Sequence, residues 1–309
     1  MNCLICQKET EGHFVEEHTD PASGQTYQLY RCAQCGVVSS VPMRLPCADW
    51  YYKAFPFRDG SADIKVRWEY ALFLSENIPH KGTLLDIGCG SGNFLLLAQR
   101  AGFRVSGIDS DARQIRKARG LGLRDVEQID FEGFYAKRGN EKFNVIVLFG
   151  VLEHVEDPRA FIRKVREMLL PDGAIAVCLP NNNRLLVFSR ELHDYPPHHF
   201  TRWTRQSLSG FLENNGFRVV TIDDSTLPFY CVQANVYSSL IKAFFGRWYG
   251  AVVSAPAGKK SGSLARVYPA LRKVALVCIA PLAFIIWMIF EISRPGRGSD
   301  IYAFARKAA

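Results

Sequence analysis

The sequence predicts an α/β protein built on a doubly wound, mostly parallel β-sheet, with a cysteine-rich N-terminal segment and a helical insert before the last strand. Three observations predict this fold. Apolar β-rich runs alternate with helical patterns between about 62 and 223, two Cys-x-x-Cys pairs lie within 1–40, and a basic, apolar stretch covers 236–299. We therefore expect three domains: 1–40, 41–235 completed by a strand within 300–309, and 236–299.

Composition narrows the class of protein. The chain has 309 residues, of which 48% are hydrophobic and 22% charged, and this excludes a disordered or coiled-coil protein. Nine Lys/Arg against one acid between 236 and 299 account for the whole net charge of +8. The first residues show no basic region followed by an apolar run, so we expect no secretory signal and a cytoplasmic location.

The central region reads as strands separated by helices. Asp157 and Pro158 predict the start of a helix that ends near Pro171-Asp172-Gly173, and a second helix is expected between Thr204 and Gly216. The expected strands are Thr83–Ile87, Arg104–Ile108, Val126–Ile129, Phe143–Leu148, Ala174–Leu179 and Arg218–Ile222, with a final strand over 300–305.

A glycine-rich turn follows the first expected strand of the sheet. Gly88, Gly90 and Gly92 come between this strand and a helix, and glycine lets the backbone turn sharply and approach a ligand. The spacing departs from the Gly-x-Gly-x-x-Gly of dinucleotide sites, and Asp86 precedes it. A carboxylate there suits a cationic ligand better than a polyphosphate. Asp109, at the end of the next strand, is placed to accept hydrogen bonds from ribose hydroxyls.

These residues resemble the class I S-adenosylmethionine-dependent methyltransferases, in a bacterial branch that carries a zinc ribbon. The resemblance covers about 80–235 and the last strand, and includes a Glu-His-Val-x-Asp-Pro segment after the expected fourth strand. It implies a Rossmann-like sheet and S-adenosyl-L-methionine as cofactor. In that family the glycine motif holds the methionine part, and acids matching Asp109 and Asp130 hold the ribose and the adenine amino group. The cofactor-binding residues so implied are Asp86, Gly88, Cys89, Gly90, Gly92, Asp109, Asp130 and Phe149.

Histidines are the candidates for proton transfer. Transfer of a methyl group to oxygen requires removal of a proton, and the pKa of histidine lies near working pH. His198 and His199 lie in an aromatic, Pro-rich loop after the fifth strand, which is expected at the ligand-binding edge of the sheet. Either is a candidate base, and His154 is a second candidate. The alternative is that a given histidine caps a helix or fills the loop.

Two cysteine pairs predict a metal site. Cys3 and Cys6 form one Cys-x-x-Cys pair, and Cys32 and Cys35 form another, which together supply four thiolates for tetrahedral Zn²⁺. So short a segment has little apolar surface, and metal binding would supply much of its folding energy. We expect a structural zinc ribbon, with redox activity or an iron–sulfur centre as alternatives.

The insert contains 17 consecutive uncharged residues, 274–290, which as a helix would measure about 26 Å. If 300–305 is a strand of the sheet, both ends of the insert lie on one side of any membrane. We therefore expect peripheral contact with an anionic membrane at its inner face, with a soluble lid or dimer interface and a true span as alternatives. No nucleic-acid motif appears, so no nucleic-acid partner is expected.

The functional expectation is an S-adenosylmethionine-dependent methyltransferase. We expect O-methylation of a sugar, a glycan or another small hydroxylated acceptor, including one linked to a lipid. A quinone or lipid methyltransferase is the enzymatic alternative, and a non-catalytic cofactor-binding scaffold is the alternative of another class. The sequence predicts neither the acceptor atom nor the oligomeric state.

Overall fold

The computed structural model describes most of the chain in two compact units. The first unit comprises residues 1–225 and 299–309, and the second comprises 226–298. The described residues are 3–47, 50–54, 67–78, 81–184, 194–225 and 299–308 in the first unit, and 232–233, 236–237, 240, 277–289, 292 and 298 in the second.

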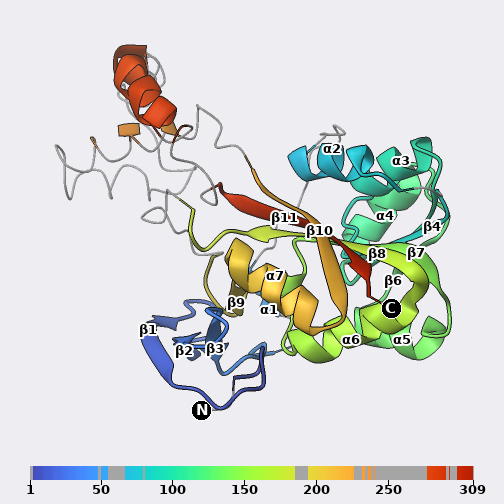
Figure 1. Ribbon diagram of the computed structural model, residues 1–309, viewed down its shortest axis with the longest axis horizontal. Coiled ribbons are helices and arrows are strands. Elements are labelled where there is room, and N and C mark those ends of the chain that lie inside the picture. Colours follow the sequence, from blue (N-terminus) through green and yellow to red (C-terminus); the bar gives the residue numbers. More distant parts are fainter. Residues whose placement is uncertain are drawn as a thin grey trace. The chain divides into compact units, whose positions relative to one another are not determined.

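The first unit is an α/β structure built on a mostly parallel β-sheet, as predicted. Within the described residues, seven strands run in the order β10-β11-β8-β7-β4-β5-β6, and the five from β6 to β8 are parallel. Strand β11 lies antiparallel between β8 and β10, so the last strand of the chain completes the sheet (Figure 1). The strands are β4 (Thr83–Ile87), β5 (Arg104–Asp109), β6 (Val126–Gln128), β7 (Phe143–Phe149), β8 (Leu169–Pro180), β10 (Phe217–Asp224) and β11 (Asp300–Lys307).

Helices cover both faces of this sheet (Figure 1). Because successive strand residues point to opposite faces, Val145 and Val147 of β7 join one hydrophobic cluster, while Ile146 and Leu148 join the other. The first cluster contains residues of α2 (Trp68–Ser75), α3 (Asn93–Arg100) and α4 (Ala112–Gly120). The second contains residues of α5 (Phe131–Arg138), α6 (Pro158–Met168) and α7 (Arg205–Asn214).

The predicted helix starts are confirmed at the level of single hydrogen bonds. The Asp157 carboxylate accepts from the amides of Arg159 and Ala160 at 3.1 and 2.9 Å, and Thr204 forms a capping box with Ser207. The predicted start of β8 was five residues late. The chain extends directly after α6, and residues 170–173 lie where the β7–β8 register shifts, so the Pro-Asp-Gly sequence interrupts a strand rather than separating a helix from one.

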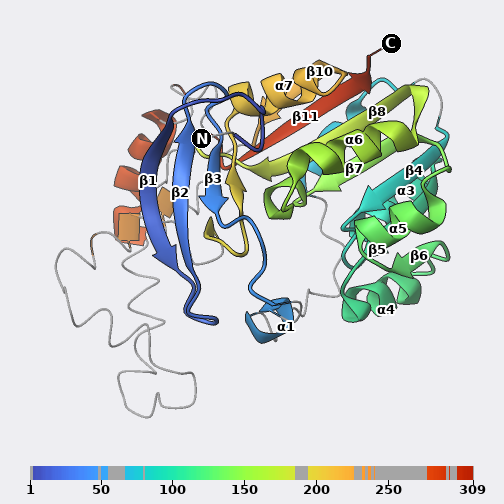
Figure 2. The same ribbon diagram turned by 90° about the horizontal axis from the view of Figure 1, so that it is seen from below.

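The N-terminal segment forms a second, antiparallel sheet (Figure 2). Its strands are β1 (Gly12–Thr19), β2 (Thr26–Cys32), β3 (Val38–Val41) and the two-residue β9 (Thr201–Arg202). Strand β9 belongs to the segment that carries His198 and His199, so this sheet takes its fourth strand from the methyltransferase-like region. Ile5 of the N-terminal segment also joins the cluster beneath α5, α6 and α7.

In the second unit, residues 277–289 form a helix with mostly apolar side chains. Ala283 is buried, whereas the apolar residues exposed along it are Val277, Leu282, Phe284, Ile285, Met288 and Ile289. No helix in the described part of the chain is both long and apolar enough to cross a membrane. Residues 274–276 and 290, and the nine basic residues of the insert, lie outside the described residues, and the predicted membrane contact stays a prediction.

Candidate functional site

The glycine turn after β4 has the backbone conformation that glycine favours. Gly88, Gly90 and Gly92 have φ angles of 74°, 53° and 81°, in the left-handed region. The amides of Gly88 and Cys89 both donate to the carbonyl oxygen of Ile108 in β5, at 2.8 and 2.9 Å. These bonds hold the turn against the end of the neighbouring strand.

The three glycines differ in what a side chain would meet. A Cβ on Gly88 would lie 2.8 Å from Val151 Cγ2, and one on Gly92 would lie 2.4 Å from Leu123 Cδ1. A Cβ on Gly90 would meet no atom within 4 Å. Packing therefore requires glycine at 88 and 92, whereas at Gly90 the backbone faces open space that a ligand can approach.

Two carboxylates belong to the surroundings of this turn, Asp109 beside Gly90 and Asp86 at the buried end of β4. Asp109 Oδ2 accepts from the Gly90 amide at 2.9 Å, and its Oδ1 accepts from the Asp111 amide at 2.8 Å. Asp86 is 3% exposed, and its burial, with the nearby charge of Asp109, raises its pKa well above the ordinary value. A cation bound between them would offset this repulsion, so the electrostatics suit a positively charged ligand.

The remaining cofactor candidates occupy different surroundings. Asp130 is exposed after β6, and its Oδ1 accepts from the Gly133 amide at 2.7 Å as the N-cap of α5. The buried Cys89 thiol packs close to Gly107 of β5 and is directed into the sheet. Phe149 is half-buried, with its ring centroid 4.9 Å from that of Phe94. Geometry alone assigns a ligand contact to none of these three.

Helix α2 and the residue before it carry a group of contacting side chains that the sequence did not indicate. The Tyr70 ring lies 5.7 Å from that of Phe149, and burial raises the pKa of Tyr70 to about 12. Arg67 places its guanidinium 5.7 Å from the Tyr70 ring and pairs with the fully buried Glu69 at 2.5 Å. These residues precede the first strand of the sheet and belong to no motif, so only their aromatic content (Trp68 lies between them) could have drawn attention.

The three candidate histidines lie together. His154 belongs to the single-turn η1 (Leu152–His154) after β7, and its ring centroid is 4.5 Å from that of His198 and 4.8 Å from that of His199. The His154 Nδ1 atom lies 2.5 Å from the carbonyl oxygen of His198. Because a carbonyl only accepts, Nδ1 carries the proton, and Nε2 of the neutral ring is the atom that can accept one.

Glu153 is a second group that the sequence prediction did not select. Its side chain is 3% exposed, and burial raises its pKa to about 8. Its Oε1 lies 3.8 Å from His154 Nε2, and within the described part of the chain Oε2 is buried without a hydrogen-bond partner. The Glu-His-Val motif is visible in the sequence, but nothing in the sequence shows that the acid is buried beside the histidine.

The histidine segment is fixed by the N-terminal sheet as well as by η1. The Phe200 amide donates to the Glu153 carbonyl at 2.8 Å, and the Phe200 carbonyl accepts from the Ser40 amide at 2.9 Å. Arg202, 7% exposed, pairs with Glu16 of β1 at 2.5 Å. The position of the histidines therefore depends on the cysteine-bearing segment.

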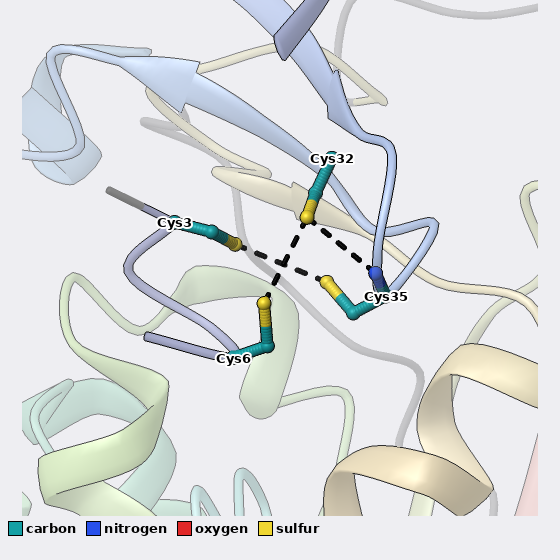
Figure 3. Close-up of side chains that lie close together, drawn as sticks. All are labelled: Cys3, Cys6, Cys32 and Cys35. Carbon is teal, nitrogen blue, oxygen red and sulfur yellow. Dashed lines mark hydrogen bonds between the residues drawn. The ribbon is translucent and has the colours of Figure 1, made fainter. Parts of the chain in front are cut away.

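The four predicted cysteine ligands lie together, with their thiol groups directed toward one another (Figure 3). The Sγ atoms of Cys3 and Cys35 are 3.9 Å apart, and those of Cys6 and Cys32 are 3.8 Å apart. A tetrahedral ion with Zn–S bonds of about 2.3 Å separates its sulfur atoms by about 3.8 Å. Hydrogen bonding, chiefly from Cys35, lowers the pKa of Cys3 to about 5, which favours the thiolate form of Cys3. The cluster fits a zinc ion.

Comparison with known proteins identifies the family. The model of the family described as "Methyltransferase domain" matches residues 65–222, just over half of the chain. The chain therefore belongs to this family, and its sheet is that of a class I S-adenosylmethionine-dependent methyltransferase, as the sequence predicted. A methyltransferase of that kind from Archaeoglobus fulgidus aligns with a TM-score of 0.50 at 18% identity, over 84% of this chain and 99% of its own. At this identity, the likeness shows the fold alone.

Curated relatives match a shorter region. A ubiquinone biosynthesis O-methyltransferase of Cereibacter sphaeroides (strain ATCC 17025) is 35% identical over 123 residues, covering 38% of this chain and 50% of the relative. The corresponding protein of Actinobacillus pleuropneumoniae is 37% identical over 101 residues, covering 30% and 43%. The chain thus spans about half the length of these relatives.

Proposed function

We propose that this protein transfers the methyl group of S-adenosylmethionine to an oxygen atom of its acceptor. The observation that carries this proposal is the orientation of His154. Its Nδ1 donates to the His198 carbonyl, which leaves Nε2 to take a proton. Val151, three residues earlier, packs 2.8 Å from the Cβ position of Gly88, so the proton acceptor and the glycine turn belong to one edge of the sheet.

We assign separate roles in cofactor binding and proton transfer to the residues of the site. The cofactor supplies a methyl group on a positively charged sulfur. We assign the ribose hydroxyls to Asp109, whose negative charge, with that of Asp86, also favours a positively charged ligand, while Gly90 lets the backbone approach the ligand. By the family resemblance, we assign the adenine amino group to Asp130, and we assign Phe149 to the cofactor site as a whole. His154, His198 and His199 orient the acceptor hydroxyl and accept its proton, and alignment of the two reacting atoms supplies much of the acceleration.

For the acceptor, we propose a ring hydroxyl of a quinone-type compound ahead of a sugar hydroxyl. The names of the curated relatives support this order, which reverses the preference drawn from the sequence. The exposed apolar residues of 277–289 and the basic composition of 236–299 also support an acceptor with a lipid tail, taken from an anionic bilayer surface. We further assign a structural Zn²⁺ to the four cysteines, supported by their sulfur spacing.

The test is a methyl-transfer assay with a labelled donor. Purified protein is incubated with short-tailed quinols bearing a free ring hydroxyl and, separately, with hydroxylated sugars, and products are identified by mass spectrometry. We expect label on the oxygen of the quinols, and loss of turnover with retained cofactor binding in His154→Gln. Intact cofactor binding without transfer to any acceptor would favour the scaffold alternative. Failure to bind the cofactor at millimolar concentration would contradict the proposal as a whole.

A further inference from the structure

The histidine cluster contains a nitrogen already oriented as metal ligands are. Metal-binding histidines commonly donate their second ring N–H to a backbone carbonyl, which fixes the ring and leaves the other nitrogen for the ion. His154 does this, since its Nδ1 donates to the His198 carbonyl oxygen at 2.5 Å. The lone pair is therefore on Nε2.

A buried carboxylate faces that nitrogen. Glu153 Oε1 is 3.8 Å from His154 Nε2, and Oε2 is buried with no hydrogen-bond partner among the residues that the structure describes. A four-coordinate ion with bonds of about 2.1 Å holds neighbouring ligand atoms about 3.4 Å apart, so only a small closing movement is needed. Burying a carboxylate without donors is costly, and a bound cation would offset that cost.

A third ligand comes from the adjacent pair of histidines. The ligand atoms of His154, His198 and His199 all lie within 4.8 Å of one another. The rings of His198 and His199 stack, with centroids 4.7 Å apart and planes only 17° from parallel. A metal ion lies in the plane of each imidazole that binds it, so one ion can be held by only one of these two rings.

We propose that Glu153, His154 and one of His198 and His199 bind a divalent transition-metal ion, distinct from the ion of the cysteine cluster. Two imidazoles and one carboxylate favour Zn²⁺ or Fe²⁺ over Mg²⁺ or Ca²⁺, and three protein ligands leave positions open for an acceptor oxygen.

The role of this ion rests on the proposed O-methylation. Coordination would lower the pKa of the acceptor hydroxyl. Because His154 Nε2 would then bind the ion, it could no longer take the proton, and the proton would pass instead to the imidazole of His198 or His199 that does not bind the ion, and then to solvent. The oxygen forms the new C–O bond, and the electron pair of the broken C–S bond stays on sulfur. This assignment gives His198 and His199 different tasks.

Metal stoichiometry tests the site without acceptor or cofactor. Tag-free, full-length protein is dialysed against excess Zn²⁺, freed of unbound metal and measured by inductively coupled plasma mass spectrometry. We expect about two zinc ions per chain for the wild type and for His13→Ala, an exposed histidine of β1, and about one for His154→Ala and Glu153→Gln. At least one of His198→Ala and His199→Ala should also lose one ion.

Cobalt loading identifies which ion is lost. Thiolate-to-cobalt absorption in the near ultraviolet reports the cysteine cluster, and it should remain in His154→Ala and Glu153→Gln. S-adenosylhomocysteine binding, measured by calorimetry, shows that these variants are folded, and its loss in the wild type would count against the proposed function alone. One metal ion per wild-type chain overturns the inference, as do two ions in His154→Ala and Glu153→Gln or retention of both in His198→Ala and His199→Ala.

Discussion

Replacement of Gly90 by alanine should separate cofactor binding from folding. The left-handed conformation of Gly90 (φ 53°) costs an alanine about 1–2 kcal/mol, and its Cβ meets no protein atom within 4 Å. We therefore expect Gly90→Ala to lower the free energy of unfolding by only that amount. In the complex, the methyl group would occupy space that the ligand needs. Crowding of about 1.4–2.8 kcal/mol corresponds to a 10- to 100-fold loss of affinity for S-adenosylhomocysteine.

Two matched variants complete the experiment, with unfolding followed in urea and affinity measured by calorimetry. Gly24→Ala carries the same strain (φ 72°) in open space between β1 and β2, so it should lose similar stability and no affinity. Gly92→Ala adds a contact at 2.4 Å with Leu123, which is itself buried, and should lose a further 1–3 kcal/mol or so. Cofactor affinity within twofold of wild type in Gly90→Ala would refute the placement of the ligand beside this glycine.

Three further predictions concern the carboxylates and the thiols. Asp109→Ala removes the acceptor of the Gly90 amide and should weaken cofactor affinity at least tenfold in calorimetry, and unchanged affinity would contradict its role. Burial raises the pKa of Glu153 from 4.5 to about 8, so the folded protein loses stability as the pH rises through this range. In urea unfolding between pH 6 and 8.5, the wild type should lose about 2.5 kcal/mol relative to Glu153→Gln, in samples with no more than one zinc per chain. Parallel pH profiles of the two proteins would count against this prediction. Cys32→Ser should remove the ion bound by the cysteines and abolish the thiolate-to-cobalt absorption, and retention of that absorption would exclude Cys32 as a ligand.

Much of the fold could be predicted because local signals agreed with the tertiary structure. The strand bounds of β4 were predicted to the residue, since a short apolar run is followed at once by the glycine turn. The caps at Asp157 and Thr204 were predicted because side-chain hydrogen bonds to nearby amides depend on local sequence. The start of β8 was predicted wrongly, because pairing with β7 across the sheet overrides the local Pro-Asp-Gly turn signal.

The site was predicted in part for the same reason. The glycine turn and the cysteine pairs are contiguous motifs, and the three histidines could be named individually. Their meeting could not, because His154 and His198 are brought together by hydrogen bonds between segments 44 residues apart. The burial of Glu153 and the contact of the Tyr70 ring with Phe149 depend on tertiary packing, which no sequence motif predicts.

The pairing of β3 with β9 has a practical consequence for engineering. Val38 and Ser39 pair with Arg202 and Thr201, so deletion of the first 47 residues would leave β9 with an open hydrogen-bonding edge. A truncated catalytic fragment should therefore tend to aggregate, and a chimaera that exchanges this region between homologues would need the stretch around 201–202 to be exchanged with it.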